Sequence, residues 1–187
     1  MNIITGLAKG IKLETLEGDA TRPTSQRVKE AIFSMIQFEI ENTRFLDLFS
    51  GSGQMGLEAV SRGATVAVMS DVSREAVDII IRNAKKTRLF DKCRISCCDY
   101  SQAIRGARGK EKFDFVFIDP PYNQKIIPEV LKSILDAGIL NYGARVICES
   151  AEKLSEYKEE ILSKFNIVRE AKYSITYITI LEVKNDE

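Results

Sequence analysis

The segment Asp119-Pro120-Pro121-Tyr122 has the clearest chemical potential, and it follows an apolar run at 114–118. Such a run is typical of a strand buried on both faces, as in a parallel sheet covered by helices. Ligands of these sheets bind beyond the carboxyl ends of the strands. The two prolines fix φ at successive residues, so they would hold a carboxylate and an aromatic ring where a substrate lies. In isolation, the same residues could also form a plain surface turn.

A second candidate site lies upstream, where residues 46–56 read LDLFSGSGQMG. Gly51, Gly53 and Gly56 satisfy the pattern GxGxxG between an expected strand and an expected helix. Glycines at this place let the backbone turn tightly and approach a ligand whose polar part meets the helix N-terminus. The pattern alone fits a nicotinamide dinucleotide, a flavin or S-adenosylmethionine.

Three acids discriminate between these ligands. Asp47 lies inside the strand before the loop, where a carboxylate suits an ammonium group and repels a pyrophosphate. Asp71 and Asp99 end the next two strands, in reach of ribose hydroxyls and an adenine amino group. Each acid alone could be a helix N-cap or a turn residue, but together they favour an adenosyl amino acid. The candidate cofactor-binding residues are Asp47, Phe49, Ser50, Gly51, Gly53, Asp71, Val72, Asp99, Tyr100 and Asp119.

Composition excludes several kinds of chemistry. The chain has no histidine, which removes His-centred acid–base catalysis, His-dependent nucleophile systems and most catalytic zinc sites, so no metal is expected. The four cysteines form no CxxC pair, and we expect reduced thiols in buried strands at all four positions. These are Cys93, Cys97, Cys98 and Cys148.

Charge and hydropathy indicate the surroundings of the protein. Lys plus Arg and Asp plus Glu number 27 each, so no global basic field marks a nucleic-acid partner. Basic residues nevertheless cluster at 82–94 and 105–112, either as solvated helix ends and loops or as phosphate contacts. The absence of a long apolar run and of a signal-peptide pattern predicts a cytoplasmic protein with no membrane partner.

Apolar strands alternate with amphipathic helices from residue 44 onward. This alternation predicts a doubly wound, Rossmann-like α/β sheet of seven strands, mostly parallel. The last two strands are too close for a crossover helix, so they should form a C-terminal antiparallel hairpin. Strands are expected near 44–49, 65–70, 93–98, 114–118, 144–149, 166–171 and 173–183, and helices near 54–62, 73–88, 100–107, 125–137 and 153–164.

The first 43 residues have a different character. Apolar residues around Gly6 and Gly10 predict a small hairpin or an extended arm. Arg22-Pro23-Thr24-Ser25 leads into a helix with apolar residues at helical spacing, and Thr24 or Ser25 would be its N-cap. We expect a single domain over 1–187, with the arm and docking helix in 1–43 and the cofactor-binding core in 44–187.

These motifs resemble the class I S-adenosylmethionine-dependent methyltransferases that modify amino groups, whose signature is [DN]PP[YF]. More narrowly, the segments RPTSQRVKEAIF (22–33), LDLFSGSGQMGLEAVSRGA (46–64) and FDFVFIDPPY (113–122) resemble the RsmD family. The resemblance covers nearly the whole chain and implies methylation of a guanine N2 in 16S rRNA, at the nucleotide numbered 966. The arm departs from the family pattern at Asn2, Thr5-Gly6 and Lys9, which bears on contact between the arm and RNA.

This chemistry assigns roles to residues. Asp119 and the Pro120 carbonyl would accept hydrogen bonds from the target amino group, and Tyr122 would stack on an extruded base. The candidate catalytic residues are Asp119, Pro120, Pro121 and Tyr122. The candidate substrate-binding residues are Arg22, Thr24, Arg27 and Tyr122, although the segment at 22–25 could serve only helix entry and capping. The expected partner is ribosomal RNA in a partly assembled small subunit, bound by a monomer.

Alternative functions remain open. A DNA N6-adenine or N4-cytosine methyltransferase would use the same chemistry, but such enzymes usually carry a separate target-recognition region, and no insertion here is large enough. From a different class, a NAD-dependent oxidoreductase or a silent nucleotide-binding module could use the glycine loop.

Overall fold

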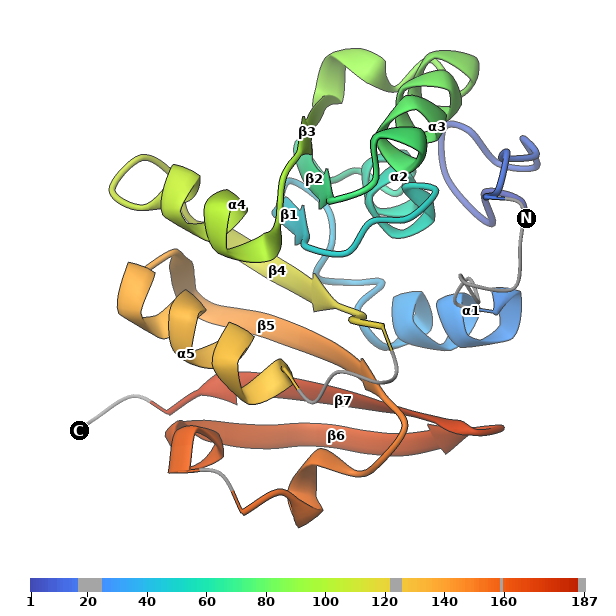
Figure 1. The fold of residues 1–187 in the computed structure, drawn as a ribbon. Coiled ribbons are helices and arrows are strands. Elements are labelled where there is room, and N and C mark those ends of the chain that lie inside the picture. The colour runs from blue at the N-terminus through green and yellow to red at the C-terminus, as the bar shows by residue number, and fades with distance from the viewer. Residues whose placement is uncertain (17–24, 122–125, 159, 185–187) are drawn as a thin grey trace.

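A seven-stranded sheet in the order β3-β2-β1-β4-β5-β7-β6 forms the centre of the protein (Figure 1). The computed structural model describes residues 1–16, 25–121, 126–158 and 160–184. The sheet runs parallel from β3 to β5, and β7 pairs antiparallel with both β5 and β6. The strands are β1 (Arg44–Asp47), β2 (Val66–Asp71), β3 (Cys93–Cys97), β4 (Phe113–Ile118), β5 (Leu140–Ser150), β6 (Phe165–Tyr173) and β7 (Thr176–Val183). The expected doubly wound sheet with its C-terminal hairpin is confirmed.

Helices cover both faces of the sheet. One apolar cluster joins α1, α2 and α3 to the first face, and a second joins α4 and α5 to the other. The α-helices are α1 (Gln26–Met35), α2 (Gln54–Ser61), α3 (Arg74–Lys86), α4 (Tyr100–Ala107) and α5 (Ile127–Ala137). The strand order reverses at β1, whose neighbours are β2 and β4. In open α/β sheets, ligands bind in the crevice outside the strand ends at such a reversal.

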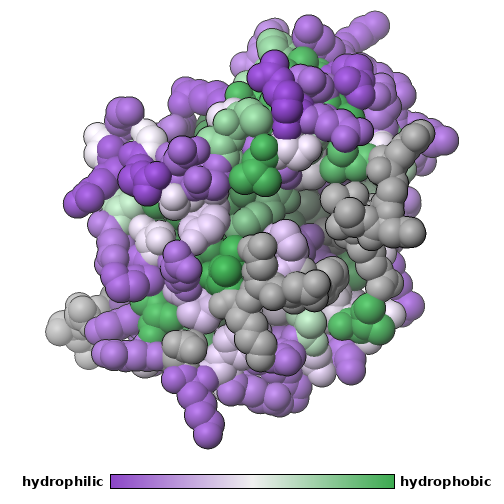
Figure 2. Space-filling view, in the orientation of Figure 1, coloured by the Kyte–Doolittle hydropathy of each residue, from purple (hydrophilic) through white to green (hydrophobic). Residues whose placement is uncertain are grey.

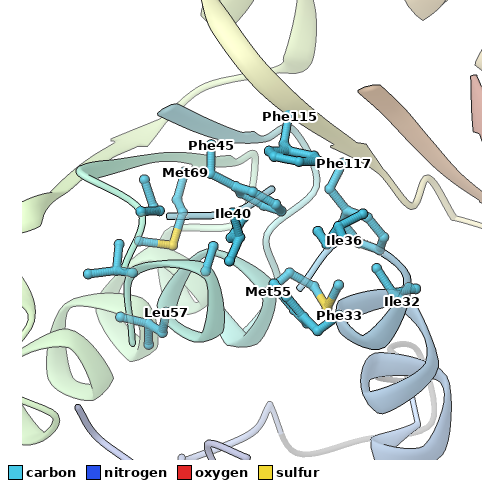
Figure 3. Packing of buried hydrophobic residues seen from close by; sticks show 14 of the residues in the cluster. Ile32, Phe33, Ile36, Ile40, Phe45, Met55, Leu57, Met69, Phe115 and Phe117 are labelled. Atoms are coloured by element: carbon cyan, nitrogen blue, oxygen red, sulfur yellow. The ribbon is translucent and has the colours of Figure 1, made fainter. Parts of the chain in front are cut away.

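The first cluster carries the docking helix predicted for the amino-terminal region. Figure 3 shows Ile32, Phe33 and Ile36 packing toward the sheet beside Phe45 and Phe115. The rings of Phe33 and Phe45 are stacked with centroids 6.3 Å apart, and those of Phe45 and Phe115 with centroids 6.4 Å apart. The Ser25 hydroxyl accepts a hydrogen bond from the Val28 amide at 3.3 Å, so Ser25 is the N-cap.

The amino-terminal arm is a small hairpin that packs on the helices of this face. Asn2 and Lys12 form an antiparallel bridge, and Ile3, Ala8 and Leu13 are buried in the first cluster. Gly6 has φ +86°, and a Cβ atom there would lie 1.7 Å from the carbonyl oxygen of Ser61. Only glycine therefore allows the arm to approach α2 this closely.

Two expectations from the sequence are wrong. The helix near 153–164 is replaced by two short 3₁₀ turns, η2 (Leu154–Glu156) and η3 (Glu160–Lys164). The Ser155 amide and hydroxyl both donate to Glu170, which is a tertiary contact that competes with helical hydrogen bonds. A further 3₁₀ turn, η1 (Phe90–Lys92), precedes β3.

The cysteines are the second error, because only Cys148 is fully buried. Cys97 is exposed, and Cys93 and Cys98 are half-buried, because β3 is an edge strand of the sheet. Burial still raises the pKa of the Cys93 thiol to about 12.

The described surface is mostly polar on the face that Figure 2 shows. The apolar side chains on this face form separate patches. Within the described ranges, no helix has the length and apolar character needed to cross a bilayer.

Candidate functional site

The glycine loop joins the carboxyl end of β1 to the N-terminus of α2, at the point where the strand order reverses. Gly51 and Gly53 have φ of +52° and +77°, which favour glycine. Gly56 has a different role, because a Cβ atom there would lie 2.5 Å from the Met69 sulfur. The first two glycines therefore shape the loop, and the third lets α2 pack closely on β2.

The side chain of Asp47 is buried beside this loop. It is 1% exposed, and no described group makes a hydrogen bond of normal geometry to either carboxylate oxygen. The nearby Ser50 hydroxyl donates to the Asp47 carbonyl at 2.9 Å. Burial raises the pKa of Asp47 to about 7, the charge of Asp71 adds to this shift, and the amides of Phe49 and Gly56 oppose it. The site thus contains a buried acceptor whose ionised form needs a cationic partner.

Asp71 holds the glycine loop against the end of β2. Its Oδ2 accepts a hydrogen bond from the Gly51 amide at 2.8 Å, and its Oδ1 accepts one from the Ser73 amide at 2.9 Å. Each carboxylate oxygen has a second lone pair that can accept a ligand hydroxyl. Val72 follows directly and is 73% exposed, which offers an apolar surface beside this carboxylate.

Asp99 is the N-cap of α4, the structural role that the sequence left open for it. Its Oδ1 accepts hydrogen bonds from the Ser101 hydroxyl at 2.7 Å and the Gln102 amide at 2.9 Å. These bonds hold the pKa of Asp99 below its ordinary value. Capping does not use both carboxylate oxygens, so contact with a cofactor stays a prediction.

Tyr100 and Phe49 bring α4 and the glycine loop together. Their ring centroids lie 5.7 Å apart, and the Tyr100 hydroxyl donates to Glu129 of α5 at 2.7 Å. Burial and this carboxylate raise the pKa of Tyr100 to about 12. The hydroxyl therefore stays protonated and fixes the ring next to the loop.

The proline segment begins where β4 ends. Phe117 lies opposite Asp47 in the parallel pairing of β1 and β4, and the Leu48 amide donates to the Phe117 carbonyl at 3.3 Å. Asp119 is therefore two residues beyond this register point, beside the start of the glycine loop. Asp119 is half-buried, Pro120 is buried and Pro121 is exposed.

Three predicted substrate residues lie outside the described residues: Arg22, Thr24 and Tyr122. Arg27 is described, and it is exposed in the first turn of α1. Contact between any of these residues and a substrate stays a prediction.

Sequence reasoning missed a buried ion pair below the arm. Lys29 of α1 and Glu58 of α2 are both 0% exposed, with Nζ 3.0 Å from Oε2. Glu58 also accepts hydrogen bonds from the amides of Ile4 at 2.8 Å and Thr5 at 3.1 Å. Burial lowers the pKa of Lys29, and Glu58 opposes this shift. The sequence feature that could have indicated this burial is that each charged residue lies directly beside apolar residues of its helix.

Three of the four arm residues that depart from the family pattern, Asn2, Thr5 and Gly6, lie at this docking contact, whereas Lys9 is exposed. The Asn2 carbonyl accepts a hydrogen bond from Lys29 Nζ at 2.7 Å, and the Thr5 carbonyl accepts one from the Ser61 hydroxyl at 2.6 Å. Gly6 packs against Ser61 as described above. These arm residues therefore hold the arm on α1 and α2.

The part of the chain that the structure describes offers no ligand set for a metal ion. No group of three or more His, Cys, Asp or Glu side chains there could hold a metal ion. The site is instead built from backbone turns, carboxylates and aromatic rings.

A mostly parallel sheet with a C-terminal antiparallel hairpin, and a glycine loop at its switch point, defines a class I methyltransferase fold. Comparison with known proteins supports this class. The structure superposes on the Escherichia coli protein yhhF with a TM-score of 0.85 and 26% identity, covering 98% of each chain.

The family follows from sequence. Residues 1–182 match the family model described as "Conserved hypothetical protein 95". The Bacillus subtilis protein YlbH is 31% identical over 181 residues, which is 96% of this chain and 97% of that protein. "Ribosomal RNA small subunit methyltransferase D" of Escherichia coli K12 is 29% identical over 150 residues, covering 80% of this chain and 74% of that protein. The chain belongs to this family and is an RsmD-family methyltransferase.

Proposed function

We propose that this protein transfers the methyl group of S-adenosylmethionine to the exocyclic N2 of a guanine in 16S rRNA of the small ribosomal subunit. The buried Asp47 carboxylate beside the glycine loop is the main observation in support of this cofactor. Membership of the RsmD family supports the substrate, since the Escherichia coli relative carries the name of a small-subunit rRNA methyltransferase.

The residues of the site fit an adenosyl amino acid. The ammonium group of its methionine part would pair with Asp47 and keep that carboxylate ionised. The outer lone pairs of Asp71 would accept the ribose hydroxyls, and Val72 would pack on the adenine. Phe49, Ser50, Gly51 and Gly53 would line the loop, with Asp99, Tyr100 and Asp119 at its edges.

A dinucleotide fits these residues less well. In dinucleotide-binding loops, free backbone amides at the helix N-terminus receive the pyrophosphate. Here the Gly51 amide donates to Asp71 at 2.8 Å, so a carboxylate of the protein already takes the position that a ligand phosphate would need. Asp47 adds a second carboxylate beside the same loop, which would repel a phosphate. These contacts support S-adenosylmethionine over NAD.

The reaction requires little covalent chemistry from the protein. The bound cofactor supplies an electrophilic methyl group on sulfonium sulfur. Asp119 and the Pro120 carbonyl would accept hydrogen bonds from the guanine NH2 and aim its nitrogen at that methyl group. The guanine nitrogen would take the methyl group from the sulfonium sulfur, which would keep the S–C electron pair, and Asp119 or an adjacent water would accept the surplus proton from nitrogen. Tyr122 would stack on the extruded base, which contributes about 1–3 kcal/mol.

Recognition of rRNA is proposed to depend on a partly assembled small subunit. The chain has no net charge, so no global basic field attracts nucleic acid, and the basic clusters at 82–94 and 105–112 are the only groups of cations identified for phosphate contact. Ribosomal proteins would then supply part of the contact surface to a single copy of this chain, with Arg22, Thr24 and Arg27 at the rim of the active site. Methylation of naked 16S rRNA as fast as that of a partial subunit would contradict this dependence.

Methyl transfer can be tested directly. RNA and DNA from cells that lack this gene are incubated with the protein and labelled S-adenosylmethionine, and the modified nucleoside is identified by mass spectrometry. We expect N2-methylguanine in small-subunit rRNA. N6-methyladenine or N4-methylcytosine in DNA would favour the alternative function. Calorimetric titration with S-adenosylmethionine and with NAD tests the cofactor separately, and tight binding of NAD alone would refute the proposal.

A further inference from the structure

Asn83 of α3 links the glycine loop to the amino-terminal arm. Its side chain is 0% exposed and makes three hydrogen bonds. Nδ2 donates to the carbonyl of Ser52 at 2.9 Å and to the carbonyl of Glu14 at 3.0 Å. Oδ1 accepts a hydrogen bond from the Glu14 amide at 2.8 Å. The opposite amide orientation would put an oxygen against two carbonyls, so this network defines the orientation.

On the loop side, α3 supports the cofactor turn from two residues that lie one helical turn apart, Ile80 and Asn83. Ser52 lies between the two glycines with positive φ, and its carbonyl accepts from Asn83. Ile80 lies one turn earlier on α3, and a Cβ atom on Gly53 would lie 2.9 Å from its Cγ2. Asp71, at the end of β2, accepts a hydrogen bond from the Gly51 amide. Asn83 therefore provides the polar contact on the face of the loop that turns toward α3.

On the arm side, Asn83 pairs with both backbone groups of Glu14, as a neighbouring strand would. Leu13 next to it is buried in the first apolar cluster. The Glu14 carboxylate adds an ion pair with Arg82 at 2.8 Å, with both side chains about half exposed. The arm is therefore fixed at Glu14, shortly before the segment with Arg22 and Thr24, the predicted substrate residues.

From this geometry we infer that Asn83 is a positioning residue that makes binding of the methyl donor depend on docking of the arm. The inference rests on the proposed function, because it takes the glycine loop as the S-adenosylmethionine site. A side chain at position 83 that cannot donate leaves the carbonyl of the buried Ser52 without this donor, and it also releases the carbonyl of the exposed Glu14. The loop must then move so that water reaches the Ser52 carbonyl, and this movement disturbs the loop conformation that binds the donor.

The variant Asn83→Asp tests this role with almost no change of shape. It keeps an acceptor for the Glu14 amide and directs a second oxygen at the carbonyls of Ser52 and Glu14. We expect a Kd for S-adenosylmethionine raised by about tenfold or more, equal to about 1.4 kcal/mol per factor of ten. We also expect faster hydrogen exchange of the amides at 50–54 in the ligand-free protein.

Asn141→Asp is the matched control. Asn141 donates to Asp114 at 2.7 Å where β5 begins, at the end of the sheet away from the loop. This variant also puts a carboxylate against an acceptor, so it should lower the melting temperature without changing the Kd or the exchange at 50–54. If Asn83→Asp behaves like Asn141→Asp in both readouts, Asn83 has only a structural role and the inference is wrong.

Substitutions at Glu14 test the contact between the arm and Asn83 separately from the ion pair with Arg82. Glu14→Pro removes the amide that donates to Asn83, whereas Glu14→Ala removes the Arg82 ion pair and keeps that amide. We expect weaker donor binding and faster loop exchange for proline than for alanine, and equal values for the two would overturn the dependence on the arm. Loop exchange needs no ligand, so it tests the link even if the wild-type protein fails to bind S-adenosylmethionine, a result that would refute the proposed function instead.

Discussion

Replacing Asp47 by asparagine should change stability and cofactor binding in opposite directions. Burial raises the pKa of Asp47 from 3.8 to about 7 in the folded protein. The unfolded chain therefore releases this proton near pH 4, while the folded protein keeps it until about pH 7. Between these values the folded state binds more protons, so stability falls as pH rises. The shift of about three units corresponds to about 4 kcal/mol lost by pH 8.

The asparagine variant lacks this titration. Between pH 4 and pH 8, the free energy of unfolding of the variant should decrease by about 4 kcal/mol less than that of the wild type. Urea unfolding of both proteins at several pH values measures the difference, in which the other titrating groups cancel. A difference that does not vary with pH would show that Asp47 does not titrate as its burial implies.

Binding of the methyl donor should respond in the other direction. Loss of a charge-assisted hydrogen bond to the ammonium group costs about 1.5–3 kcal/mol, so the Kd of the variant should rise by about tenfold to a hundredfold at pH 8. The wild-type protein should bind more tightly as pH rises through 7, because Asp47 ionises there, and the variant should not. Equal affinity of the two proteins at pH 8 would refute the assignment of Asp47 to the ammonium group.

Four other variants test three separate parts of the molecule. Asp119→Ala should bind S-adenosylmethionine normally and lose about 10²-fold or more of methyl transfer in single-turnover assays, and unchanged turnover would remove Asp119 from the mechanism. Glu58→Ala leaves Lys29 buried without its partner and should cost about 3–5 kcal/mol in urea unfolding, whereas Lys29→Met combined with Glu58→Leu should cost less. Arg22→Gln should keep the wild-type melting temperature and reduce the rate of methyl transfer to RNA. If the melting temperature and the rate fall together, Arg22 has a capping role alone.

The pattern of strands and helices could be predicted because it depends on local spacing. The alternation of apolar strands with amphipathic helices indicated the parallel sheet, and the hairpin followed from the short connection before β7. The sequence could not show which strand lies at an edge, so the exposure of Cys97 on β3 was missed. The helix expected at 153–164 failed because Ser155 bonds to Glu170 on another strand, a contact that no local pattern reports.

Sequence by itself determined the glycine turn and the order of acids at the strand ends, because backbone conformation and alternation are properties of neighbouring residues. Tertiary structure alone decided which polar groups are buried together. Lys29 and Glu58 are 29 residues apart in the chain, and Asn83 meets Glu14 across 69 residues. The raised pKa of Asp47 likewise comes from the strands and helices packed around it. Desolvation and hydrogen bonding depend on distance in space, and only the folded chain sets those distances.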